Sequence, residues 1–151
     1  MKKNIYIIIG HGACGKSSLV RALTGVYRGV SRLIRVGNEE DFEDLQFAIW
    51  VRSRQEVSDK PKQVLKDVNS CNEKNVLITL RFGAYNRCPE AKEYVDLLMT
   101  EHNISRIVYM GREKNPDRLT YPLIESEQIG NSVGTPVNAN ANVARKFFGW
   151  L

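Results

Sequence analysis

The residues best suited to chemistry form one short stretch near the start of the chain, Gly10-His11-Gly12-Ala13-Cys14-Gly15-Lys16-Ser17. The stretch has the spacing G-x-x-x-x-G-K-[ST], in which the glycines allow the backbone amides to turn inward around an anion. In such a loop the lysine reaches the β- and γ-phosphate oxygens of a nucleotide, and the serine hydroxyl joins the shell of a magnesium ion. The stretch therefore predicts a phosphate-binding loop.

The segments on either side of this loop fit the same interpretation. Ile5 to Ile9 is a short apolar run typical of a buried strand, and Ser18 to Leu23 is typical of the first turns of a helix. A helix that begins at the loop adds unpaired amides and the positive end of its dipole. The predicted phosphate-binding residues are Gly10, His11, Gly12, Ala13, Cys14, Gly15, Lys16, Ser17 and Ser18.

Strand-like and helix-like segments alternate along the rest of the chain, which predicts an α/β fold with a mainly parallel sheet. We expect one domain over residues 1–151. The expected strands are 31–36, 46–51, 76–80, 104–110 and 119–124, the last as an edge strand because of Pro122. We expect one helix after Pro61 and a second after Pro89. A third, C-terminal helix should begin near Val143, after a loop over 131–142. Ligands of such sheets bind at the carboxyl ends of the strands, here after Ile9, Val36, Val51, Leu80 and Met110.

Residues 5–24 resemble the P-loop NTPase superfamily, and residues 10–26 are similar to the corresponding loop and helix of translational GTPases. The resemblance implies a three-layer P-loop NTPase-like fold with helices on both faces of the sheet. It also implies that Lys16 contacts phosphate and that Ser17 is a ligand of Mg²⁺. The chain has neither a D-x-x-G nor an N-K-x-D motif, so guanine preference does not carry over. The expected ligand is ATP or GTP, with ATP slightly preferred.

A carboxylate for the magnesium ion is not evident from the sequence. Superfamily members usually place one after a later apolar strand, but here Leu80 is followed by Arg81, and Met110 by Gly111-Arg112. Either Ser17, the phosphates and water hold the ion, or a carboxylate of the acidic cluster at Asp41, Glu43 and Asp44 reaches it. The alternative for that cluster is a solvated surface. We take Ser17 and Asp41 as the candidate metal ligands.

Arginines also follow the predicted strand ends, where they would screen charge during phosphoryl transfer. Lys16, Arg81, Arg112 and Arg118 are the candidate catalytic residues. Two functions remain open. The first is a kinase-like phosphotransferase that passes phosphate from a purine triphosphate to a small-molecule or protein acceptor. The second is a nucleotide-dependent binding or regulatory module with weak NTPase activity, which the missing motifs favour.

The composition places limits on partners and compartment. The formal net charge of +5 suits an anionic ligand, but no run of positive charge resembles a nucleic-acid arm, so nucleic acid is a less favoured partner. Three cysteines, Cys14, Cys71 and Cys88, form no C-x-x-C pair, which favours a reducing, cytoplasmic setting. The apolar run at 5–9 is too short for a signal peptide, and we expect no membrane segment.

Overall fold

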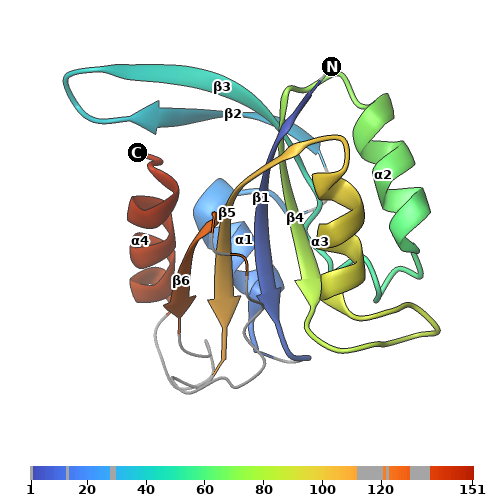
Figure 1. The fold of residues 1–151 in the computed structure, drawn as a ribbon. Coiled ribbons are helices and arrows are strands. Elements are labelled where there is room, and N and C mark those ends of the chain that lie inside the picture. The colour runs from blue at the N-terminus through green and yellow to red at the C-terminus, as the bar shows by residue number, and fades with distance from the viewer. Residues whose placement is uncertain (1, 13, 28–29, 112–120, 122, 130–136) are drawn as a thin grey trace.

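The computed structural model describes residues 2–12, 14–27, 30–111, 121, 123–129 and 137–151. Its strands form one six-stranded sheet in the order β2-β3-β4-β1-β5-β6 (Figure 1). Neighbouring strands pair in parallel, except that β2 runs antiparallel to β3 at the edge. The strands are β1 (Asn4–Gly10), β2 (Val30–Gly37), β3 (Phe42–Ile49), β4 (Asn75–Arg81), β5 (Asn103–Met110) and β6 (Glu125–Ile129).

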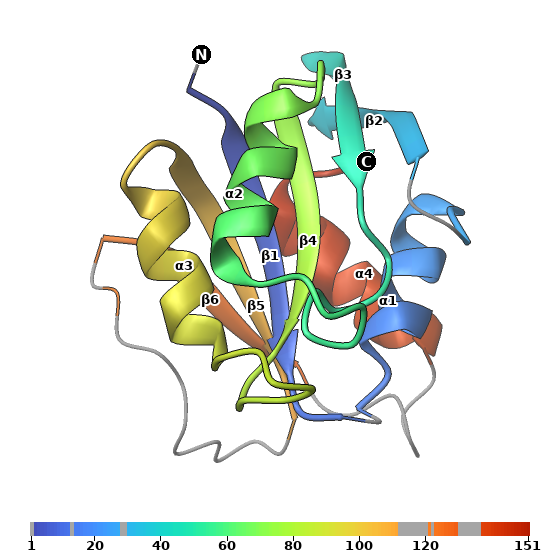
Figure 2. The same ribbon diagram turned by 90° about the vertical axis from the view of Figure 1, so that its right-hand side faces the viewer.

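Helices cover both faces of this sheet (Figures 1 and 2). The helices α1 (Lys16–Thr24) and α4 (Val137–Phe148) share one apolar cluster with the sheet, and α2 (Pro61–Ser70) and α3 (Ala91–Met99) share the other. On β1, Ile8 belongs to the first cluster and Ile7 to the second, and both are fully buried. A strand covered on both sides is apolar at successive positions, which explains the continuous run at 5–9. The predicted α/β class with a mostly parallel sheet is therefore confirmed.

Most predicted elements are present, and the differences lie toward the edges of the sheet. The third strand begins at Phe42 rather than Gln46 because it pairs with β2 as a hairpin, with Gly37 opposite Phe42. The last strand is β6 at Glu125–Ile129, so the prediction of a strand at 119–124 is wrong; residues 119, 120 and 122 of that range lie outside the described residues. The mostly polar sequence of β6 carries no strand pattern, and its parallel pairing with β5 decides its position.

The C-terminal helix starts earlier than its apolar pattern indicates. Helix α4 begins at Val137, so the second half of the predicted loop at 131–142 is helical, while 131–136 lie outside the described residues. Ala141 and Ala144 are buried against the α1 side of the sheet. The helix ends at Phe148, and Trp150 then forms a bridge with Val36 of β2. The last residues of the chain therefore pack against the edge hairpin.

Candidate functional site

The glycine-rich loop connects β1 to α1 at a topological switch point of the sheet. Strands β1 and β4 are parallel neighbours, but the helix after β1 covers one face and the helix after β4 covers the other. In open α/β sheets, ligands bind in the crevice that such a divergence leaves at the carboxyl ends of the strands. Gly15, the residue before α1, has φ of +92°, a left-handed conformation that favours glycine. The loop thus lies where the fold leaves room for a ligand.

Close packing explains the two earlier glycines of the loop. A Cβ atom added to Gly10 would lie 2.5 Å from Cys14 Sγ and 2.9 Å from the carbonyl oxygen of Met110 on β5. One added to Gly12 would lie 2.7 Å from Cζ of Arg81. The loop is therefore in direct contact with β5 on one side and with the Arg81 guanidinium on the other.

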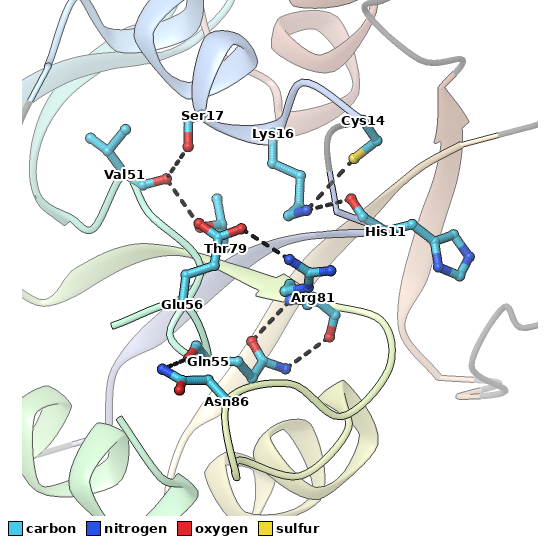
Figure 3. Close-up of polar contacts among 10 residues, drawn as sticks. All are labelled: His11, Cys14, Lys16, Ser17, Val51, Gln55, Glu56, Thr79, Arg81 and Asn86. Atoms are coloured by element: carbon cyan, nitrogen blue, oxygen red, sulfur yellow. Dashed lines mark hydrogen bonds and ion pairs between the residues drawn. The ribbon is translucent and has the colours of Figure 1, made fainter. Parts of the chain in front are cut away.

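Lys16 lies over its own loop at the first residue of α1. Its Nζ donates a hydrogen bond to the His11 carbonyl oxygen at 2.7 Å and lies 3.7 Å from Cys14 Sγ (Figure 3). The side chain is only 5% exposed, and this burial lowers the pKa of its ammonium group. A bound phosphate would stabilise the charged form of the lysine, because an opposite charge at short range offsets the cost of desolvation.

Ser17 points toward the ends of β3 and β4. Its hydroxyl donates to the Val51 carbonyl oxygen at 3.4 Å, and the buried Thr79 hydroxyl of β4 donates to the same oxygen at 3.1 Å (Figure 3). The position on β4 that faces Ser17 across this oxygen is therefore occupied by a threonine and not by a carboxylate.

A carboxylate reaches the loop from an unexpected segment. Glu56, in the connection between β3 and α2, lines a pocket of about 220 Å³ together with Gly15, Lys16, Ser17 and Ser18. Its Oε1 lies 3.6 Å from Nη1 of Arg81. Lysine, arginine, serine hydroxyl and carboxylate thus converge from three separate segments of the chain.

Gln55 holds these segments together. Its buried side chain accepts a hydrogen bond from the Arg81 amide at 2.9 Å and donates to the Arg81 carbonyl oxygen at 2.8 Å. The paired bonds fix the connection containing Glu56 to the end of β4. Sequence reasoning missed both residues, because an isolated Gln-Glu pair in a polar loop has no motif spacing. The only available signal was its position shortly after the third predicted strand.

Asp41 does not lie near Ser17, so the prediction that it reaches the metal site is corrected. Asp41 is in the turn of the β2–β3 hairpin, where its carbonyl oxygen accepts a bond from the Asn38 amide at 3.0 Å. Because β3 runs parallel to β4, its first residues lie at the end of the sheet where the parallel strands begin, and the phosphate loop lies at the opposite end (Figure 1). Because β2 is antiparallel to β3, Val36 pairs with Glu43 and lies at this same end of the sheet, away from the phosphate loop. Asp44 pairs with Arg35 at 3.1 Å on this hairpin.

Of the remaining predicted site residues, some lie at the loop and the others lie outside the described residues. His11 stacks on Phe82 with ring centroids 5.6 Å apart, and Cys14 is 97% buried with its sulfur against Gly10. Arg81 is in contact with the loop, whereas Ala13, Arg112 and Arg118 lie outside the described residues. Among the described residues there is no cluster of three or more His, Cys, Asp or Glu side chains suited to a metal.

Comparison with protein-family models, with curated proteins and with solved structures found no match to this chain. The resemblance of residues 5–24 to the P-loop NTPase superfamily therefore stays a prediction. No helix in the described part of the chain is both long enough and apolar enough to cross a membrane.

Proposed function

We propose that the chain binds the phosphates of a purine nucleoside triphosphate, with Mg²⁺, on the loop Gly10 to Ser17. The observation that carries this proposal is the convergence of Lys16, Arg81 and Glu56 on the start of α1 at the β1/β4 switch point. The loop amides and Lys16 supply the anion contacts, and the positive end of α1 adds to them. We retain ATP as the slightly preferred nucleotide.

Mg²⁺ fits the side chains at this site, because the Ser17 hydroxyl and the Glu56 carboxylate line one pocket and are hard oxygen donors. The ion would neutralise phosphate charge when bound. Glu56 takes the place of Asp41 in this proposal.

The favoured reaction is transfer of the γ-phosphoryl group to an acceptor. Arg81 lies against the loop at Gly12, where its guanidinium would face the oxygens of a bound phosphate and stabilise their charge during transfer. A phosphate would also compete with Glu56 for Arg81, since their 3.6 Å pair is partly exposed and weak. We expect Arg81 to exchange one anion for the other when nucleotide binds.

A nucleotide-dependent binding module is the second candidate, and the end of β4 favours it. Thr79 and Arg81 occupy the strand end next to the loop, and neither activates a water molecule. In both cases we expect hydrolysis without an acceptor to be well below the ~10 s⁻¹ typical of enzymes. Movement of labelled γ-phosphate to an acceptor would support the transferase. Retention of intact triphosphate together with a nucleotide-dependent partner would support the module.

Thermal unfolding with Mg·ATP and Mg·GTP tests the binding proposal. Nucleotide at a hundred times its dissociation constant should stabilise the protein by about 2.7 kcal/mol. Lys16→Ala should abolish this gain, whereas Lys74→Ala, an exposed lysine just before β4 at the opposite edge of the sheet, should preserve it. If no nucleoside phosphate stabilises the native protein, the proposal is wrong.

The magnesium ligand is tested with a matched pair of variants. Glu56→Gln should weaken the dependence of nucleotide binding on Mg²⁺ concentration, because it removes one charged oxygen donor. Asp41→Asn should leave that dependence unchanged, because Asp41 lies at the other edge of the sheet. The opposite result would restore Asp41 as the ligand and remove Glu56.

A further inference from the structure

A second pocket, a groove open to solvent, lies at the connection between β4 and α3, on the face covered by α2 and α3. It has a volume of about 840 Å³, within the range of small-molecule sites. Its apolar part includes Pro61 of α2, Cys88 and Pro89 of the connection, and Leu97 of α3. We call it the α2–α3 groove.

Positive charge surrounds this groove. Lys60 and Lys62 at the start of α2 and Arg87 in the connection line it, against one carboxylate, Glu93. No ion pair joins any of the three cations to a carboxylate within the described part of the chain. An anionic group bound here would meet cations that form no ion pair within the described residues, beside an apolar surface.

The backbone that presents Arg87 is strained. Tyr85 and Cys88 exchange two backbone hydrogen bonds of 2.8 and 3.0 Å, and the two residues between them, Asn86 and Arg87, have φ of +52° and +62°. Two consecutive left-handed residues form the tight turn in which the second position favours glycine. An arginine is sterically strained there, because its Cβ lies close to the following carbonyl oxygen. Strain of this kind is retained where surrounding structure and function require a particular side chain.

The same turn is linked to the phosphate loop through Arg81. The Tyr85 ring lies 3.8 Å from the guanidinium of Arg81, which in turn lies against Gly12. The Asn86 amide donates to the Ser58 hydroxyl, and Ser58 is the third described non-glycine residue with positive φ. All three such residues therefore lie in the β3–α2 and β4–α3 connections, which separate the groove from the phosphate loop.

We propose that the α2–α3 groove binds a small organic anion, a sulfonate, carboxylate or phosphate monoester carried on an apolar body. The anionic group lies at Arg87 and the two lysines, and the apolar body packs on Pro61 and Leu97. This site goes beyond the proposed nucleotide function and does not depend on it, because none of its lining residues belongs to the phosphate loop.

Titration calorimetry with 2-naphthalenesulfonate tests the groove, with 2-naphthalenemethanol as the neutral analogue and inorganic sulfate as the anion without an apolar body. Wild-type protein should bind the sulfonate at least tenfold more tightly than either control compound. Arg87→Gly should lower sulfonate affinity at least fivefold while raising the melting temperature, because glycine relieves the left-handed strain. Asn86→Gly relieves the neighbouring strain without removing a charge from the groove, so it should keep the affinity.

The outcomes separate this proposal from the nucleotide one. Equal sulfonate affinity for wild-type protein and Arg87→Gly, binding of the neutral analogue as tight as that of the sulfonate, or no binding at all would overturn the groove. Lys16→Ala should bind the sulfonate normally. If Lys16→Ala loses nucleotide binding but binds the sulfonate normally, both proposals are supported. If wild-type protein binds the sulfonate but shows no effect of any nucleotide, only the groove proposal remains.

Discussion

Replacing Gly10 by alanine should destabilise the protein through a defined steric conflict. The new Cβ would lie 2.5 Å from Cys14 Sγ, 2.9 Å from the Met110 carbonyl oxygen and 3.2 Å from Met110 Cβ. The strand β5 cannot move away from the new methyl group easily, because Gly10 and Met110 are paired neighbours in the sheet. Inserted methyl groups in packed interiors cost about 1–3 kcal/mol, and two simultaneous conflicts place Gly10→Ala near the upper end. For a chain of this size that corresponds to about 5–10 °C in melting temperature.

A double-mutant cycle identifies the source of the cost. Cys14→Ala removes the sulfur but leaves the Met110 oxygen, so Gly10→Ala should cost about 1 kcal/mol less in that background than in the wild-type chain. Gly83→Ala is the control, because a Cβ there has no heavy atom within 4 Å and its φ is not positive, and its effect should stay within about 0.5 kcal/mol. Denaturant unfolding of the four variants of the cycle and the control measures these differences. Additive effects of the two substitutions, or a Gly10→Ala protein as stable as wild type, would refute the packing argument.

Two further predictions concern parts of the fold away from the loop. Burial lowers the pKa of His102, whose Nδ1 accepts a bond from the Lys3 amide at 3.0 Å while Nε2 faces Asn69 Oδ1 at 2.6 Å. The unfolded chain takes up the proton first, so stability should be unaffected above about pH 6.5 and should fall as the pH drops from there to the lowered pKa. His102→Gln should flatten this part of a denaturation profile, and identical profiles for the two proteins would exclude His102 as the cause. Trp150→Ala should cost about 3–5 kcal/mol, because the 97% buried ring packs on Phe47 and Phe148 at centroid distances of 5.1 and 4.8 Å. Faster amide exchange at Gly37, which donates to the Gly149 carbonyl oxygen, should accompany the loss, and unchanged protection there would show that the C-terminal residues do not hold the hairpin.

The strand, loop and helix around residues 4–24 could be predicted from the amino-acid sequence, because each signal there is local. Glycine, lysine and serine stand at fixed spacing in one contiguous segment, and the apolar run at 5–9 requires a strand buried on both faces. The buried stripe of α3, formed by Ala91, Tyr94, Val95 and Leu98, follows from helical periodicity alone in the same way.

The other side chains that meet the loop could not be predicted, because they come from segments that are distant in the sequence. Asp41 looked suitable because a parallel second strand would have carried it to the loop, but β2 pairs antiparallel to β3 and places it at the far edge. Glu56 reaches the loop because Gln55, 26 residues before Arg81, binds both backbone groups of that residue. Strand direction and contacts between distant segments depend on the packing of the whole chain, and no spacing within one segment of sequence records them.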